Sequence, residues 1–200
     1  MKVLLVNGSP RKDGCTNRAL EEVKKSLEKE GIDAEIFWIG TKNQGCIACG
    51  KCYTLGKCVF DDAVNEFASK AKDADGFVFG SPVYYASMAG GIKSFMDRLF
   101  YSSSKYLKNK PGASVVSCRR AGSTLTFSEM NMYFTINNMP LVSSQYWNEV
   151  HGNTKEEVEQ DLEGLQTMRT LGTNMAWLLK SLKTSEKPTY EKRVGTNFIR

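Results

Sequence analysis

Four cysteines fall within thirteen residues of the chain, and residues of this type at this spacing bind metals. They follow the pattern C-x2-C-x2-C-x5-C, as Cys46, Cys49, Cys52 and Cys58. Iron–sulfur clusters take four thiolates at similarly compact spacings. Zinc also takes four thiolates, although three ligands at consecutive x2 spacings are less usual for it. The spacing favours a cluster over zinc, and a loop without metal is the remaining alternative.

A second segment whose residues could bind a ligand is 7–17, with the sequence NGSPRKDGCTN. It precedes an expected helix, and a helix N-terminus binds phosphate through its free N–H groups and its dipole. The segment has neither the Gly-Lys-Ser/Thr ending of an NTPase loop nor the G-x-G-x-x-G of a dinucleotide fold. It therefore suits the single phosphate of a mononucleotide, with plain helix capping by Thr16 as the alternative. The candidate phosphate ligands are Ser9, Arg11, Thr16 and Asn17.

A third segment, 80–91, reads GSPVYYASMAGG and is suited to a planar ring. Such a ring needs flat apolar contacts and backbone donors for its polar edge. The residues that can supply both are Pro82, Val83, Tyr84 and Tyr85. Ordinary loop packing of the tyrosines is the alternative. Arg119 or Arg120, after a later strand, can contact a phosphate or stabilise negative charge on a reduced ring.

These segments connect short apolar runs that alternate with helix-period runs, a pattern typical of a parallel sheet with helices on both faces. The strands are expected at 2–6, 34–39, 76–80, 113–118 and 140–146. The helices are expected at 16–31, after an Asp62 cap, around 92–99, at 126–138 and at 155–183. In a sheet of order 2-1-3-4-5, ligands bind at the carboxyl ends of strands 1 and 3. The two unusual loops follow those two strands.

The remaining organisation is that of one domain. We expect this domain to span residues 1–184, with a cysteine-rich loop at 40–60 and a basic, polar tail at 185–200. A connection of about twenty residues exceeds the usual two to six, and loops of that length are generally functional. The tail, which ends in Phe198 and Ile199 before the last arginine, is either loose or laid across a partner subunit.

Composition narrows the function further. The chain has 200 residues, a net charge of +5 and 41% hydrophobic residues, which is ordinary for a globular domain. Basic side chains are scattered among glutamates, which indicates a solvated surface rather than a nucleic-acid face and favours small anionic partners. No apolar run suits an export signal or a membrane span. We therefore expect a cytoplasmic protein with reduced cysteines.

Three segments resemble a known family. The loop 8–17, the SPVYY run at 81–85 and the IKSFMDR run at 92–98 are similar to the NADPH-dependent FMN reductases of the flavodoxin-like superfamily. The cysteine run followed by VFDD at 59–62 resembles the iron–sulfur flavoproteins within that family. The resemblance covers most of residues 1–150. It implies an α/β flavodoxin-like three-layer sandwich around a five-stranded parallel sheet of order 2-1-3-4-5.

The resemblance also implies cofactors and roles. Ser9, Arg11, Thr16 and Asn17 would hold the FMN phosphate, and Pro82–Tyr85 would line its ring. The four cysteines of the run match the ligands of a [4Fe-4S] cluster. The implied activity is electron transfer from NADPH or NADH through FMN to a small-molecule or protein acceptor, in a homodimer or homotetramer. The alternative is an electron carrier fed by ferredoxin.

The basic charge favours the enzyme, because flavodoxin carriers tend to be acidic. A zinc-bearing module without flavin is a third, weaker possibility. We expect no essential acid–base residue, because the flavin performs the chemistry. His151, the one histidine, is expected to be structural.

Overall fold

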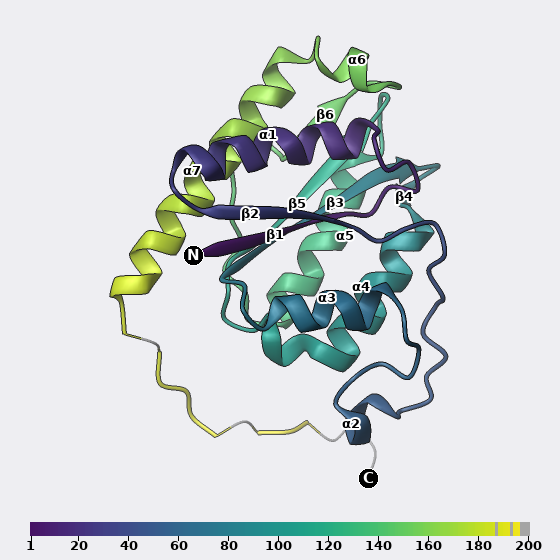
Figure 1. The fold of residues 1–200 in the computed structure, drawn as a ribbon, viewed down its shortest axis with the longest axis vertical. Helices are drawn as coiled ribbons and strands as arrows, with labels where there is room; N and C mark the ends of the chain where they lie inside the picture. The colour runs from purple at the N-terminus through teal and green to yellow at the C-terminus, as the bar shows by residue number, and fades with distance from the viewer. Residues whose placement is uncertain (187, 193, 197–200) are drawn as a thin grey trace.

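A computed structural model of the chain describes residues 1–186, 188–192 and 194–196. A central sheet separates two layers of helices (Figure 1). The strands are β1 Lys2–Asn7, β2 Asp33–Trp38, β3 Gly76–Tyr84, β4 Ser87–Met88, β5 Gly112–Cys118 and β6 Glu149–His151. The helices are α1 Cys15–Lys29, α2 Cys52–Leu55, α3 Ala63–Ala71, α4 Gly90–Ser103, α5 Ser123–Ile136, α6 Lys155–Val158 and α7 Leu162–Thr184, with a 3-10 turn at Ser104–Tyr106.

The sheet has the order β2-β1-β3-β5-β6, and all of these neighbours pair in parallel. The two-residue β4 pairs antiparallel with the end of β3 and lies off this path. Without β4, the order is the predicted 2-1-3-4-5, so the flavodoxin-like three-layer fold is confirmed. β1 and β5 are almost wholly buried, as their continuous apolar runs require of central strands covered on both faces.

Each face of the sheet has its own apolar core. On one face α1 and α7 cover β1, β3 and β5, and their apolar stripes meet between the helices and the strands. On the other face α3, α4 and α5 surround an aromatic cluster, in which the rings of Phe67 and Phe95 meet edge to face at 5.6 Å. The helices on both faces hold the carboxyl ends of the strands in fixed positions.

The fifth strand lies later in the chain than predicted. Within the predicted 140–146, only Leu141 forms a bridge to Gly112, and the strand proper is β6 at Glu149–His151. Between them the Ser144 hydroxyl bonds to the Tyr146 carbonyl at 2.6 Å and to the Asn148 side chain at 2.8 Å. Local side-chain hydrogen bonds of this kind compete with a strand ladder. The chain therefore loops out before it rejoins the sheet.

The last helix is divided in two. Thr154 accepts a hydrogen bond from the Glu157 amide at the start of α6. Asp161 then accepts one from the Gly164 amide at 2.9 Å and so starts α7 afresh. The two caps explain why the predicted single helix is interrupted. The predicted tail follows α7, and its Phe198 and Ile199 lie outside the described residues. In the part of the chain that the structure describes, we found no helix long and apolar enough to cross a membrane.

Candidate functional site

A cavity of about 190 Å³ opens at the carboxyl ends of the strands, where the strand order reverses around β1 and β3. Ligands of open α/β sheets bind at this position. The cavity is lined from the loop after β1, the start of α1, the end of β3, and the segments that follow β5 and β6. Its lining residues are Ser9, Arg11, Cys15, Thr16, Pro82, Val83, Tyr84, Ser117, Cys118, Arg119, Gly152 and Asn153.

The loop between β1 and α1 is held rigidly on the cavity's floor. The Gly8 amide donates to the Gly80 carbonyl at 2.9 Å, so the loop is tied to β3. The Trp38 indole donates to the Ser9 carbonyl at 2.8 Å. Buried Thr16 shares a 2.8 Å hydrogen bond with Ser117, which ties the first turn of α1 to β5. The free amides of that turn and the Ser9 and Thr16 hydroxyls form a donor set that fits a phosphate.

The opposite wall is a hairpin formed by the end of β3 and by β4. Its two-residue tip places Tyr85 at a φ of 60°, a left-handed conformation that is rare for tyrosine. The Ala89 amide donates to the buried Ser81 hydroxyl at 3.2 Å. At the far end, Glu129 of α5 accepts a hydrogen bond from Ser87 and forms an ion pair with Lys93 of α4. The hairpin is therefore attached to both helices beneath it.

The cavity collects seven of the nine predicted cofactor ligands. They are Ser9, Arg11, Thr16, Pro82, Val83, Tyr84 and Arg119. The two others lie outside it. The Asn17 amide donates to Glu21 at 2.8 Å and its oxygen accepts from Asn7. Tyr85 is fully exposed at the hairpin tip.

Five lining residues were not among the predicted ligands, and they are Cys15, Ser117, Cys118, Gly152 and Asn153. Ser117 and Cys118 end β5, whereas Gly152 and Asn153 follow β6, so the rule for strand ends could have found them. Burial raises the pKa of the Cys118 thiol, and it raises that of Cys15 as well. Both thiols are therefore held in their neutral form and are poor nucleophiles.

All four cysteines of the run line a second, smaller pocket of about 30 Å³. Cys46 and Cys49 are exposed, Cys52 is half-buried on the one-turn helix α2, and Cys58 is buried. Within the described residues, no three His, Cys, Asp or Glu side chains are gathered closely enough to hold a metal ion. The pocket is completed by Ile47, Val59, Phe60, Arg98, Tyr101 and Ser102, with Gly50.

Arg98 of α4 is the charged residue of this pocket. Its Nε lies 3.2 Å from the Cys58 sulfur, and its two Nη atoms bond the Asp62 carboxylate at 2.7 and 2.8 Å. Burial opposes the charge of the guanidinium, but these hydrogen bonds outweigh it and raise the pKa of Arg98 above its ordinary value. The arginine is therefore permanently charged beside Cys58.

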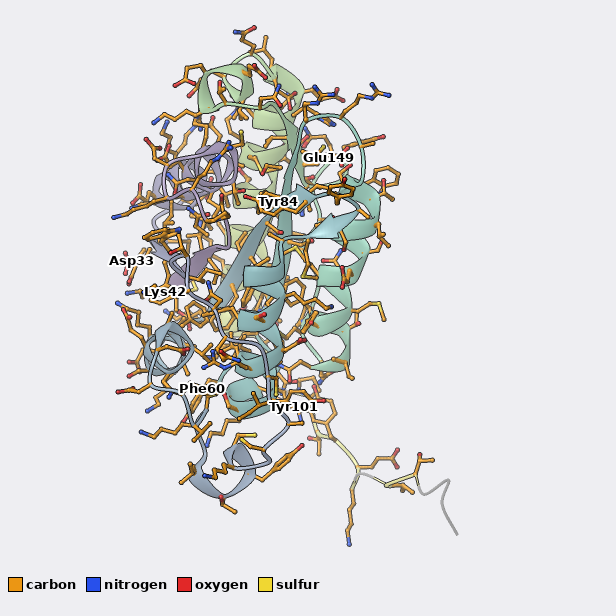
Figure 2. All side chains as sticks on the ribbon, turned by 90° about the vertical axis from the view of Figure 1, so that its right-hand side faces the viewer. Asp33, Lys42, Phe60, Tyr84, Tyr101 and Glu149 are labelled. Atoms are coloured by element: carbon orange, nitrogen blue, oxygen red, sulfur yellow. The ribbon has the colours of Figure 1, made fainter. Side chains whose placement is uncertain are left out.

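The two pockets lie in different parts of the molecule and share no lining residue. Figure 2 shows Tyr84 of the larger cavity well apart from Phe60 and Tyr101 of the cysteine pocket. In Figure 1, α2, which lies within the cysteine loop, is at the bottom of the view, away from the sheet. One helix, α4, connects them: its N-terminus supports the hairpin, and Arg98 lies eight residues further on. At 1.5 Å per residue this is about 12 Å along the helix.

Comparison with known proteins defines the class of protein first. RosB, solved with bound 8-demethyl-8-formylriboflavin-5'-phosphate, superposes with a TM-score of 0.76 at 15% identity and covers 98% of this chain and 92% of its own. An archaeal flavodoxin superposes with a TM-score of 0.61 at 18% identity, covering 90% of this chain and 99% of its own. The fold is thus that of flavodoxin-like proteins.

The family follows from sequence. The family model for NADPH-dependent FMN reductase matches residues 1–154, so the chain belongs to that family. An iron-sulfur flavoprotein of Methanocaldococcus jannaschii is 33% identical over 192 residues, which cover 92% of this chain and 100% of the relative. Both matches support a flavin-dependent oxidoreductase with FMN as its cofactor.

Proposed function

We propose that the chain is an FMN-dependent oxidoreductase that passes electrons from NADPH or NADH through bound FMN to a small-molecule or protein acceptor. The observation that carries this proposal is the cavity at the switch point, where the loop after β1 and the β3–β4 hairpin meet. FMN supplies the redox chemistry, since a flavin accepts a hydride and releases electrons singly or in pairs. The protein binds the cofactor, orients it and sets its electrostatic surroundings.

Each wall of the cavity has a different task. Ser9, Thr16 and the first turn of α1 hold the phosphate, and Arg11 adds positive charge at the mouth. Asn17 joins them only if its amide gives up the bond to Glu21. Pro82, Val83 and Tyr84 line the ring, with Tyr85 at its exposed edge. The cavity of about 190 Å³ is smaller than the roughly 300–1,000 Å³ of pockets that bury most of a ligand, so part of the bound cofactor would remain accessible to electron donors and acceptors.

The cysteine pocket is the proposed second redox centre. Cys46, Cys49, Cys52 and Cys58 would hold a [4Fe-4S] cluster, because four cysteines that line one pocket supply the four thiolates that such a cluster needs. The pocket of about 30 Å³ has room for little more than one or two water molecules. Cluster binding is therefore coupled to rearrangement of the loop, as metal binding and folding commonly are.

A second candidate function is favoured by this second pocket. If the cluster receives electrons from ferredoxin and the flavin passes them on, the chain is an electron carrier without a nicotinamide site. Iron-sulfur flavoprotein is the name of the Methanocaldococcus relative, and a 30% identical relative from a Bacillus strain is named NADPH azoreductase. We favour the enzyme, in a homodimer or homotetramer, because the basic chain differs from acidic carriers.

Anaerobic mixing of the FMN-loaded protein with NADPH, NADH or reduced ferredoxin tests the choice. Rapid loss of the visible flavin absorption with a nicotinamide nucleotide is the expected result. If neither nucleotide reduces the flavin while ferredoxin does, the carrier is the correct function. If no condition loads FMN at all, both proposals fail.

Two adjacent arginines give a matched pair of variants. Arg119 and Arg120 are both exposed, but only Arg119 lines the cavity. We expect Arg119→Gln to raise the KM for the nucleotide or the Kd for FMN several-fold, because it removes a cation at the mouth. Arg120→Gln should leave both constants unchanged. Equal effects of the two substitutions would contradict the assignment of Arg119.

A further inference from the structure

The guanidinium of Arg98 is an unusual feature of the cysteine pocket, because it is charged and only 2% exposed. A buried charge is costly unless it is paired and fully hydrogen-bonded. Arg98 is paired with the Asp62 carboxylate on one side and donates to the Gln44 carbonyl at 3.1 Å on the other. The N–H on its Nε is directed at the Cys58 sulfur.

These contacts fix the direction of the Nε–H bond. Asp62 engages both Nη atoms, and this two-point contact holds the plane of the guanidinium. The Asp62 carboxylate is itself held, because it accepts the Val64 amide at 3.1 Å as the N-cap of α3. The Phe60 ring lies over the guanidinium carbon at 4.9 Å. Arg98 thus joins α3, α4 and both ends of the cysteine loop.

Cys58 is the cysteine that this arrangement holds in place. It is 9% exposed, whereas Cys46 and Cys49 are exposed on the loop. The Cys58 amide donates to Asn65 at 3.0 Å, and the Asn65 side chain donates back to the Cys58 carbonyl at 2.9 Å. With backbone and sulfur both fixed, Cys58 is the one ligand of the run whose position is set in advance.

We propose that Arg98 is a positioning residue of the iron–sulfur centre, one that fixes the Cys58 sulfur and, through its charged N–H, raises the reduction potential of the cluster. This inference rests on the proposed cluster. Reduction adds a negative charge to the cluster, and a positive charge or a hydrogen-bond donor at a ligand sulfur stabilises that charge. Removal of Arg98 therefore shifts the potential in the negative direction.

The test compares the wild-type protein with Arg98→Lys and Arg98→Gln after anaerobic reconstitution with iron and sulfide. A redox titration followed by the electron paramagnetic resonance of the reduced cluster gives the potential. The FMN potential in the same sample serves as an internal reference. We expect Arg98→Gln to shift the cluster to a more negative potential. Arg98→Lys should fall between the two, because lysine keeps the charge but lacks the planar fork.

Two further variants separate an effect on the cluster from a general loss of folding. Arg98→Gln leaves Asp62 without its partner, so the double variant Arg98→Gln with Asp62→Asn removes the unpaired carboxylate as well. Arg18→Gln is the matched control, since Arg18 is also buried and paired with glutamates but lies on α1, away from the four cysteines of the run. We expect it to lower stability without moving the cluster potential.

A measurement on the unaltered chain avoids the folding question altogether. With nitrogen-15 in the arginine side chains, the reduced cluster should show a hyperfine coupling to one arginine nitrogen. Absence of that coupling, or a folded Arg98→Gln protein with the wild-type potential, overturns the inference about Arg98 alone. Failure of the wild-type protein to retain iron and sulfide overturns the cluster and the inference together.

Discussion

The two pockets differ in how much of their geometry exists before any ligand is bound. The switch-point cavity measures about 190 Å³ and is lined from segments spread between residues 9 and 153. The cysteine pocket measures about 30 Å³, and its residues come from one loop and one helix. Sheet and helices fix the first pocket, whereas a loop with only a single helical turn forms most of the second.

The difference lies in the hydrogen bonds. The floor of the cavity is tied to three separate strands by Gly8, Ser9 and Thr16. In the cysteine loop, Ala48, Gly50 and Gly56 adopt left-handed conformations, which leaves the backbone curved and largely exposed. The Cys58 end is anchored through its backbone and its sulfur, whereas Gln44 at the other end is held by one bond to Arg98. We expect FMN to bind in the cavity without large changes of the backbone. We expect the cysteine loop, in contrast, to become ordered as it binds the cluster.

The largest effect is expected for Cys49→Ser, which tests whether the two sites are separable. The variant should lose essentially all of about four iron atoms per chain, because a cubane needs its four thiolates, and it should keep its FMN. Iron, sulfide and flavin analysis after anaerobic purification measures both. Cys15→Ser is the matched control, since the hydroxyl can replace the thiol that bonds the Gly152 carbonyl. Loss of iron in both variants would contradict the assignment.

The second-largest effect is expected for Gly8→Ala, which disturbs the packing of the rigid switch-point cavity. A Cβ on Gly8 would lie 2.5 Å from the Cβ of Ile92 and 2.6 Å from the Gly80 carbonyl oxygen, so backbone must move. Overpacking of this kind costs about 1–3 kcal/mol, and the FMN affinity should fall with it. Urea unfolding and FMN titration measure the two losses. Gly90→Ala, whose Cβ meets open space, should show neither.

The contrast between the pockets also explains what the sequence alone could predict. The apolar runs were enough to predict a parallel sheet between two layers of helices, and the family resemblance supplied its order. The unusual loops at 7–17 and 80–91 contain six of the predicted ligands that line the cavity. Ser117 and Asn153 were within reach of the rule for strand ends, but Asn153 was missed because the fifth strand was placed at 140–146 instead of at Glu149–His151. Asn17 was a plausible ligand by position, but its side chain bonds Glu21 one turn along the helix.

For the cysteine loop, the sequence indicated the candidate chemistry but not the tertiary contacts. The spacing of the four cysteines favoured an iron–sulfur cluster over zinc or a loop without metal, whereas Arg98 was noted only as part of a resembling motif. Its contact with Cys58 joins residues forty positions apart, a separation that periodicity and spacing do not reveal. The fifth strand was misplaced for a related reason: Ser144 and Asn148 bond locally, which an apolar pattern at 140–146 does not show.

A smaller effect is expected for Thr16→Val, which removes one donor from the rigid site and keeps its shape. The variant loses the hydrogen bond to buried Ser117 and a candidate phosphate ligand. A hydrogen bond to a charged group contributes about 1.5–3 kcal/mol, so loss of the bond from Thr16 to the FMN phosphate should raise the Kd for FMN roughly tenfold or more. Thr135→Val, on the exposed surface of α5, is the control and should bind FMN normally. An unchanged Kd in Thr16→Val would remove Thr16 from the phosphate site.

The smallest effect concerns the helix that carries the phosphate loop. Glu22 of α1 is buried and bonds Arg18 at 2.8 Å and Arg169 of α7 at 2.7 Å. Burial alone would raise the pKa of Glu22, but the bonds to Arg169 and Arg18 outweigh it and hold the pKa below its ordinary value of 4.5. A carboxyl group with a lowered pKa in the folded state stabilises the fold above its unfolded pKa. That stability is lost as the pH falls through the folded value.

Urea unfolding at neutral pH and at successive steps below about pH 4.5 measures this loss. The wild-type midpoint should fall more steeply with acid than that of Glu22→Gln, which has no carboxyl to protonate. Glu30→Gln is the matched control, because Glu30 pairs with Lys180 on the exposed surface and should change the slope little. FMN release should track the unfolding of the wild-type protein, since α1 supplies the phosphate site. Identical slopes in all three proteins would show that the Glu22 pairs do not hold this helix.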